Sequence, residues 1–306
     1  MVSSVNKRFR PSDIREGLRF RRPTTKNHLR NYVRVFLGVE VPNKVLTEGH
    51  SSPMDYLWYA FNADFLKQKK GNADAVVWAN RGGGKTELAG ILTLLECIFK
   101  DGCQIRILSG SGLQAGRMYE YFRRFLKRGY EGLVEDITTW PSDKTSFKNG
   151  AVVEVLKQSE TSVRSHHVHK LRCDEVELFK PRVYEAAQYT TMSTEGLVAS
   201  LDCISTMHKR HGLMKKLVDE AEKLGRPVFK WNLWDVIEKC RGRSCSDCKL
   251  NDVCKGKARD GIGYFKITDA ITQLERTKAA SFNLEMLCGE SGKKKGWGWV
   301  FGWRKY

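Results

Sequence analysis

The sequence predicts an α/β domain in which helices cover both faces of a doubly wound, mostly parallel sheet. From Ala73 onward, short apolar runs alternate with longer segments whose apolar residues recur at helical spacing. A glycine-rich turn separates the first run from the first helical segment, and a later run ends in two consecutive acids. Alternating strands and helices favour a parallel sheet because each helix carries the chain back across it. The domain is expected to span residues 51–235.

Each apolar run and helical segment has its place in this scheme. The strands are expected at 75–79, 104–109, 151–156, 168–173 and 197–205, and the helices between them at 86–99, 113–128, 181–189 and 213–224. Residues 1–50 are interpreted as a basic arm with a helix near 29–37, residues 236–290 as a Cys-rich loop with a helical linker pair at 267–287, and residues 291–306 as a basic aromatic tail.

The overall charge indicates a polyanionic partner. The 306 residues include 53 Lys and Arg against 35 Asp and Glu, a formal net charge of +18. No apolar run approaches the roughly 18 residues that a membrane-spanning helix needs, and the N-terminal segment lacks the apolar stretch of a signal peptide. These features predict a cytoplasmic protein that does not enter a membrane.

The glycine-rich turn has the composition of a phosphate-binding loop. Glycines permit positive φ angles that turn successive N–H groups toward one anion, and the following helix N-terminus adds partial positive charge. Lys85 is expected to reach the β- and γ-phosphates of ATP, and Thr86 to offer its hydroxyl to Mg²⁺. The usual first glycine is replaced by Ala79. The predicted ATP-binding residues are Arg81, Gly82, Gly83, Gly84, Lys85 and Thr86.

The paired acids Asp174 and Glu175 complete the pattern of an ASCE-type P-loop NTPase. In such hydrolases the first acid holds Mg²⁺, and the second polarises the attacking water. Asp174 is therefore the predicted metal residue, and Glu175 the catalytic one. An Asp-Glu pair also begins many surface helices, so the assignment depends on the phosphate loop upstream. Together the two motifs predict Mg²⁺-dependent ATP hydrolysis.

Two arginines are candidates for stabilising the charge that spreads over the phosphoryl oxygens during transfer. Arg81 lies inside the loop, and Arg164 shortly before the acidic strand. Three places of action are open for Arg164: the nucleotide site of its own chain, the site of a neighbouring subunit, or DNA. A surface salt bridge is the further alternative for either residue.

Four of the nine cysteines lie within fifteen residues, at Cys240, Cys245, Cys248 and Cys254. Few apolar residues stand between them, so a bound metal is expected to hold the loop together. Tetrahedral Zn²⁺ is the first interpretation, an Fe–S cluster the second because C-x4-C-x2-C also binds clusters, and uncoordinated thiols the third. The histidines show no ligand spacing with this cluster and are expected at the surface or behind the site.

With these motifs, the chain resembles the ATPase domain of the large terminase subunit, the genome-packaging motor of tailed bacteriophages. The resemblance rests on the arginine-containing loop 81–86, the strand and helix at 107–115, the Asp174-Glu175 pair, and Ile204-Ser205-Thr206. The last matches the family's coupling motif, which implies that Ser205 and Thr206 sense the γ-phosphate. The resemblance also places residues 52–58 near the adenine ring.

The resemblance implies a motor that moves double-stranded DNA into a procapsid. It implies a homo-oligomeric ring that works with a portal and a small terminase subunit. Contacts to DNA are expected at phosphates, from Arg117, Arg123, Arg124, Lys127 and Arg128. Large terminases continue into a nuclease domain, and no nuclease activity is expected here because residues 291–306 contain no Asp or Glu. The alternatives are a helicase-like translocase and a nucleotide-gated DNA-binding or assembly protein.

Overall fold

The computed structural model describes residues 16–65, 73–110, 112–139, 143–164, 167–209 and 211–289. Its centre is an eight-stranded sheet with the order β3-β4-β5-β2-β6-β7-β1-β8. The strands are β1 (Ala75–Ala79), β2 (Gln104–Ser109), β3 (Val134–Thr138), β4 (Lys144–Phe147), β5 (Val152–Val155), β6 (Lys170–Asp174), β7 (Ser200–Ser205) and β8 (Val228–Trp231). The basic aromatic tail predicted at 291–306 and the N-terminal 15 residues lie outside the described residues.

The sheet is mixed and mostly parallel, which confirms the predicted fold class. The strands from β5 to β8 in this order pair in parallel, whereas β3, β4 and β5 pair antiparallel at one edge. All five predicted strands are present, with ends shifted by up to three residues. Strands β3, β4 and β8 were not predicted from the sequence.

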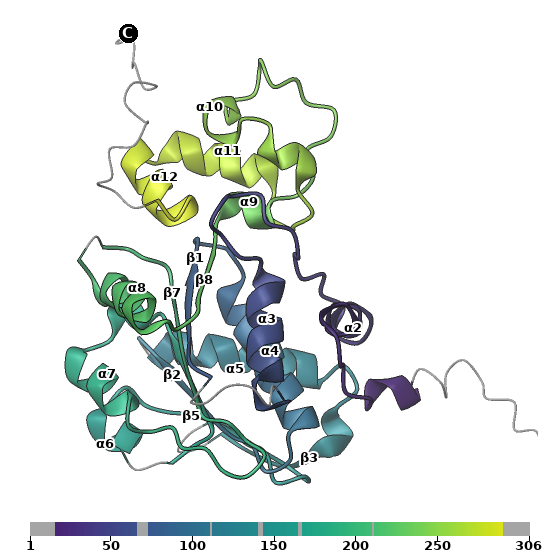
Figure 1. Cartoon of the computed structure of the whole chain (residues 1–306). Coiled ribbons are helices and arrows are strands. Elements are labelled where there is room, and N and C mark those ends of the chain that lie inside the picture. The colour runs from purple at the N-terminus through teal and green to yellow at the C-terminus, as the bar shows by residue number, and fades with distance from the viewer. Residues whose placement is uncertain are drawn as a thin grey trace, which may run out of the picture.

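Helices cover both faces of the sheet (Figure 1). One face carries α2 (Lys26–Tyr32), α3 (Pro53–Asn62), α4 (Lys85–Phe99) and α5 (Gly112–Leu126), and the other carries α6 (Glu160–Arg164), α7 (Pro181–Ala187) and α8 (Leu213–Leu224). The interior strand β1 serves both layers: Ala75 and Val77 pack in one core, and Val76 and Trp78 in the other. A strand buried on both faces reads as a continuous apolar run, which is why β1 was recognisable.

The helix predicted near 29–37 begins as α2 and continues as the π-helix η1 (Val33–Leu37). It is joined to the core by the Tyr32 hydroxyl, which lies 2.7 Å from that of Tyr130. Helix α3 follows, and Ser52 and Asp55 form a capping box at its start. The sheet domain also contains three short 3-10 helices: η2 (Ala63–Phe65), η3 (Glu131–Leu133) and η4 (Val176–Leu178).

A small C-terminal subdomain lies beyond one end of the sheet (Figure 1). It comprises α9 (Leu233–Val236), α10 (Asn251–Cys254), η5 (Lys257–Asp260), α11 (Ile267–Arg276) and α12 (Ala279–Met286). It has a core of its own, to which Trp234, Leu250 and Phe282 contribute. The predicted helical pair at 267–287 is present as α11 and α12. No helix among the described residues is long and apolar enough to cross a bilayer.

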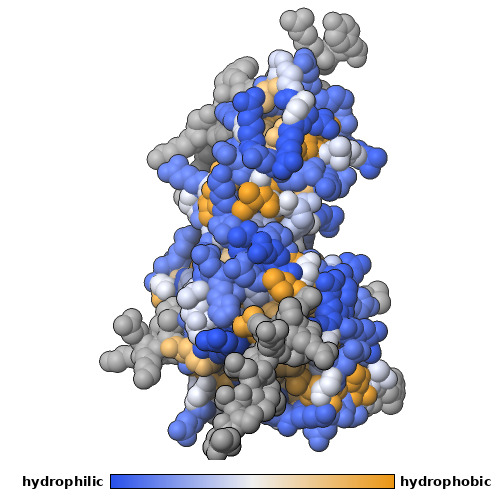
Figure 2. All heavy atoms as spheres, turned by 90° about the vertical axis from the view of Figure 1, so that its right-hand side faces the viewer, coloured by the Kyte–Doolittle hydropathy of each residue, from blue (hydrophilic) through white to orange (hydrophobic). Residues whose placement is uncertain are grey.

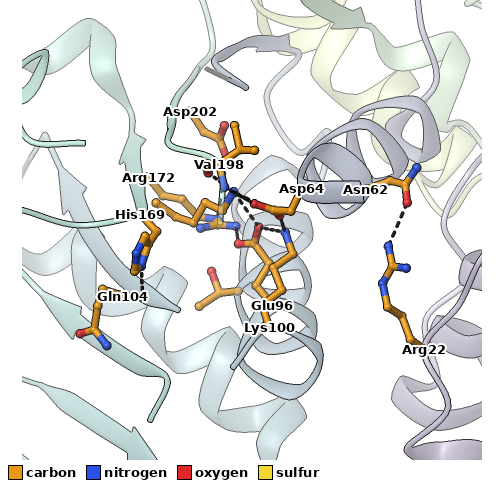
Figure 3. Close-up of polar contacts among 12 residues, drawn as sticks. Arg22, Asn62, Asp64, Glu96, Lys100, Gln104, His169, Arg172, Val198 and Asp202 are labelled. Carbon is orange, nitrogen blue, oxygen red and sulfur yellow. Dashed lines mark hydrogen bonds and ion pairs between the residues drawn. The ribbon is translucent and has the colours of Figure 1, made fainter. Parts of the chain in front are cut away.

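A network of buried charges joins α4 to the sheet. Figure 3 shows Glu96 of α4 and Lys100, the residue just after this helix, pointing toward Arg172 and Asp64. Glu96 forms ion pairs with Lys100 at 2.7 Å and with Arg172, and Lys100 also pairs with Asp64. These side chains are at most 1% exposed. Buried ions remain charged only when each has an opposite partner, so these contacts fix α4 against β6.

Candidate nucleotide-hydrolysis site

The phosphate loop leaves β1 and enters α4 as the sequence predicts. Gly82 and Gly84 both have a φ of 71°, in the left-handed region that favours glycine, and Gly84 is the N-cap of α4. Ala79, at the position of the usual first glycine, is still the last residue of β1 and pairs with Trp231 of β8. An alanine is compatible with this position because the strand continues through it.

Neighbouring side chains close tightly over the loop. The indole N–H of Trp231 donates a hydrogen bond of 2.8 Å to the Gly83 carbonyl. A Cβ atom placed on Gly82 would lie 2.8 Å from the ring of Phe265, which belongs to the C-terminal subdomain. A Cβ on Gly83 would lie 2.5 Å from the Asn80 side chain. A side chain at Gly82 or Gly83 would therefore collide with these neighbours.

Lys85 and Thr86 meet the ends of the two neighbouring strands. The Lys85 ammonium lies 3.0 Å from a Glu175 carboxylate oxygen and donates to the Thr206 hydroxyl at 2.9 Å. The Thr86 hydroxyl donates to Asp174 Oδ2 at 3.0 Å. Strands β6, β7 and β1 are adjacent and parallel, so residues that follow their carboxyl ends converge at one edge.

The two acids differ in their electrostatic environment. Burial raises the pKa of Asp174 to about 6, against the opposing charge of Lys85. Burial also raises the pKa of Glu175, but His208 and Lys85 outweigh it and hold this pKa at about 2. The backbone of Glu175 has a φ of 51°, which is uncommon for a residue other than glycine. Such strain is concentrated at functional sites, and this carboxylate contacts Lys85 of the loop.

Further contacts surround Glu175. The Ser205 hydroxyl donates to Glu175 Oε2 at 3.3 Å, so both predicted coupling residues contact the core of the site. His208 Nε2 lies 3.6 Å from the same oxygen, and His208 Nδ1 lies 2.9 Å from Glu285 Oε1 of α12. The sequence predicted a place for His208 at the surface or behind the site but no role, and nothing was predicted for Glu285. A histidine three residues after Ser205 is the only sequence signal for the first, and Glu285 has none.

The two candidate arginines have different outcomes. The Arg81 side chain is 73% exposed, and its Nε lies 3.9 Å from Glu285 Oε2. The Arg81 amide donates to the Glu285 carbonyl at 2.9 Å, so this residue joins the loop to α12. Arg164 is the last residue of α6, and its side chain lies outside what the structure describes. Its predicted role stays a prediction.

A pocket lies beside the phosphate loop. Pro53, at the start of α3, is the one residue of the segment 52–58 among its lining residues. The pocket is lined by Val39, Glu40, Val41, Pro42, Pro53, Gly83, Gly84, Glu87, Leu88, Ile91 and Tyr264. The apolar surfaces and the Tyr264 ring match the planar, weakly polar faces of a purine.

The four clustered cysteines face one cavity in the C-terminal subdomain. Cys240, Cys245, Cys248 and Cys254 all line it. Two donors approach their sulfurs: the Ala258 amide at 3.5 Å from Cys254 Sγ, and Arg259 at 3.2 Å from Cys245 Sγ. Within the described ranges, however, no three His, Cys, Asp or Glu side chains are grouped closely enough to hold a metal ion.

Comparisons with known proteins identify the fold. No protein-family model matches the sequence, and no curated protein matches it. The structure is similar to the HK97 bacteriophage large terminase, with a TM-score of 0.58 and 16% identity over 86% of this chain and 55% of that one. It is also similar to the large terminase of a thermophilic bacteriophage in complex with ADP, with a TM-score of 0.50 and 12% identity over 76% of this chain and 52% of that one.

These matches confirm the structural resemblance to phage large terminases that the sequence indicated. The chain spans about half the length of each of these two terminases. At such low identities the likeness concerns the α/β fold, and the chemistry must be argued from this chain's own residues.

Proposed function

We propose that this chain hydrolyses Mg²⁺-ATP and uses the energy to move double-stranded DNA, as the motor part of a viral packaging terminase. The observation that carries the proposal is the convergence of Lys85, Asp174 and Glu175 within one set of contacts at the phosphate loop. The terminase-like fold supports the choice of DNA packaging among the many tasks of P-loop ATPases.

The arrangement suits in-line attack of water on a γ-phosphate. The Lys85 ammonium contacts Glu175 and Thr206. An incoming triphosphate offers this ammonium stronger anionic partners. Glu175, ionised at neutral pH by its lowered pKa, accepts a hydrogen bond from the attacking water and orients it. Ser205 and Thr206 then lie beside the transferred group, where loss of the γ-phosphate changes their contacts.

Mg²⁺ fits the residues at the end of β6. Thr86 and Asp174 bring a hydroxyl and a carboxylate oxygen within 3.0 Å of each other beside the loop, the oxygen ligands that this ion prefers. When bound, Mg²⁺ neutralises charge on the phosphate oxygens. Thr86 and Asp174 are the residues that would hold it.

Exposed basic residues on α5 support a duplex-DNA partner. Arg117, Lys127 and Arg128 are exposed at or just beyond this helix, whereas Arg124 pairs with Glu87 of α4. The side of the molecule on which α2 lies is largely hydrophilic, with apolar atoms in small separate patches (Figure 2). Contacts to phosphates suit a motor that must accept any sequence. A ring of such chains, with a portal and a small terminase subunit, belongs to the same proposal.

The test is the ATPase rate of the full chain with and without blunt duplex DNA. We expect duplex DNA to stimulate turnover more than single-stranded DNA of the same length. Preferential stimulation by single strands would favour the helicase-like translocase. Negligible turnover with every DNA, at nucleotide concentrations where ATP binds, would favour the nucleotide-gated binding protein.

The α5 surface gives a prediction about salt. Replacing Arg117, Lys127 and Arg128 by Ala should weaken duplex binding and lower the slope of log affinity against log salt by about one for each phosphate that is no longer neutralised. Basal ATP turnover should stay unchanged. The measurement is fluorescence anisotropy of labelled duplex between low and physiological salt. The matched control replaces Arg182, Lys216 and Lys223, exposed on α7 and α8 across the sheet. Equal effects of both triple variants would exclude α5 as the specific surface.

We further propose that the four cysteines bind a metal, with Zn²⁺ preferred over an Fe–S cluster. Their shared cavity and the donors to two of the sulfurs support this, because N–H donors stabilise thiolates. Binding requires the sulfurs to move closer together than they are, toward the roughly 2.3 Å bonds of a tetrahedral site.

Metal content decides this second proposal. Elemental analysis of protein purified without chelator should find about one Zn per chain. Cys245→Ser together with Cys248→Ser should abolish it, whereas Cys203→Ala, in the sheet, should not. Iron with visible absorbance would establish the cluster alternative, and metal-free, folded wild-type protein would overturn the proposal.

A further inference from the structure

A chain of charged side chains runs from the catalytic carboxylate to the C-terminal subdomain. Glu175 follows β6, His208 follows β7, and Glu285 belongs to α12. His208 Nε2 lies 3.6 Å from Glu175 Oε2, an ion-pair distance, and His208 Nδ1 lies 2.9 Å from Glu285 Oε1, a hydrogen bond. The imidazole thus contacts one carboxylate with each ring nitrogen, and three distant segments meet in one contact series.

These contacts are shielded from water. The side chains of Glu175, His208 and Glu285 are only 18%, 23% and 24% exposed. Exposed ion pairs contribute little because water and salt screen them, but partial burial strengthens this one. Glu175 and Glu285 together raise the pKa of His208 to about 9, so the imidazole is positively charged at neutral pH.

The contacts of Lys85 show why a second cation beside Glu175 is useful. Within the described part of the chain, Lys85 is the other cation that contacts this carboxylate, at 3.0 Å. Phosphate binding requires the Lys85 ammonium, since this is the lysine of the phosphate loop. When Lys85 turns to the phosphates, the side chains of the described residues that remain on the Glu175 carboxylate are Ser205 and His208. Of these two, only His208 carries a charge.

Glu285 contacts the loop as well as the histidine. Its carbonyl accepts the Arg81 amide at 2.9 Å, and its second carboxylate oxygen lies 3.9 Å from Arg81 Nε. One residue of α12 therefore contacts both the backbone of the phosphate loop and the cation that faces the catalytic carboxylate. A displacement of α12 would change both contacts at once.

We propose that His208 is a positioning residue that holds Glu175 toward the attacking water, and that Glu285 couples this hold to the position of α12. The inference rests on the proposed ATPase function and deepens it. It makes the C-terminal subdomain a control element of hydrolysis: α12 docked against the loop keeps His208 in place, and α12 displaced releases it. A partner or neighbouring subunit that moves α12 would thereby set the rate.

The first test is steady-state ATPase kinetics of the full chain. His208→Ala should lower kcat about 10–100-fold, the usual loss when a residue that orients a functional group is removed, with KM for ATP changed little. His208→Lys should restore part of this loss because it keeps a positive charge, and His208→Gln should not. Glu285→Gln should give a smaller loss, and Glu275→Gln on α11 is the matched control. Thermal melting of each variant establishes that it is folded.

Coupling gives the second readout. The double variant His208→Ala, Glu285→Gln should be no slower than His208→Ala alone, because Glu285 acts through the histidine. In Glu285→Gln the charges that face His208 are reduced to Glu175, with Lys85 and Arg81 behind the two carboxylates, so the pKa of His208 falls. The kcat of this variant should decline as pH rises from about 7 to 9, relative to wild type.

The outcomes distinguish the positioning role from the ATPase proposal. A folded His208→Ala variant with wild-type kcat, alongside an inactive Glu175→Gln, would overturn the positioning role and leave the ATPase proposal intact. Fully additive losses in the double variant would overturn the coupling to α12. A wild-type chain without ATP turnover, or a fully active Glu175→Gln, would instead refute the proposed function itself.

Discussion

Glu175→Gln is expected to lower kcat for ATP hydrolysis about 10²–10⁴-fold, the range for loss of a group that activates the attacking water. ATP binding should survive and become somewhat tighter. The reason is the contact of Glu175 with Lys85 at 3.0 Å: a neutral amide competes less with phosphate for that ammonium. The carboxylate shape is retained, so the loss reports on charge.

Two measurements check this expectation: phosphate release under saturating ATP, and the affinity for a fluorescent ATP analogue. Lys85→Ala provides the opposite pattern, because it removes a binding partner of the phosphates and should weaken affinity as well as turnover. Glu185→Gln, exposed on α7, is the control and should behave as wild type. A Glu175→Gln variant with normal turnover would assign the water-activating role to another residue.

Buried interior strands were predictable, and the strands at the sheet edges were not. In β1 each of five consecutive residues is buried, so the apolar run is unambiguous. Strand β3 has mostly exposed or half-buried residues with acids among them, and it lacks both an apolar run and a clear alternation. Strand β8 is half-buried at the other edge. Edge strands are formed by pairing with a neighbour, information that a local pattern does not contain.

In the candidate site, too, residues within a local motif were predictable, and residues brought in by tertiary contacts were not. Contiguous motifs singled out Lys85 and Glu175, which the fold brings within 3.0 Å of each other, while their roles stay predictions. His208 and Glu285 were missed because 77 positions separate them and neither belongs to a motif. Arg81 is mostly exposed beside Glu285, a contact that the sequence did not predict, and its role at the phosphates stays a prediction. Residues that act through tertiary contacts are found only when the fold has brought their elements together.

The buried charges were not predicted from the sequence for a related reason. Lys170 and Arg172 interrupt the apolar run of β6 and look like residues of a solvent-facing strand side. The acids that neutralise them come from other elements, Glu96 from α4 and Asp202 from β7. A charge on a strand is therefore no sign of exposure when helices cover both faces, and its burial depends on partners far away in the chain.

Glu96→Gln is expected to lower the free energy of unfolding by about 3–5 kcal/mol, the usual loss when one partner of a buried ion pair is removed. The substitution leaves Lys100, Lys170 and Arg172 with Asp64 and Asp202 as their remaining anions. Burial raises the pKa of Asp202 to about 6, so this acid is mostly ionised at neutral pH, but it compensates only in part because its oxygen lies 3.9 Å from Arg172 Nε. A loss of this size is a large part of the roughly 5–15 kcal/mol that stabilises a typical domain.

Urea unfolding at several pH values measures the difference in the free energy of unfolding between wild type and Glu96→Gln, and shows how this difference changes with pH. Burial raises the pKa of Glu96, but Arg172 and Lys100 outweigh it and hold this pKa at about 2, below the ordinary value of 4.5. A depressed acid stabilises the fold above its unfolded pKa and loses that contribution as pH falls through its folded pKa. The difference between wild type and Glu96→Gln should therefore be constant from pH 7 to about pH 5 and shrink toward pH 2.

Glu120→Gln, exposed on α5, should stay within about 0.5 kcal/mol of wild type. A difference of the same small size for Glu96→Gln would mean that the buried cations do not depend on this carboxylate.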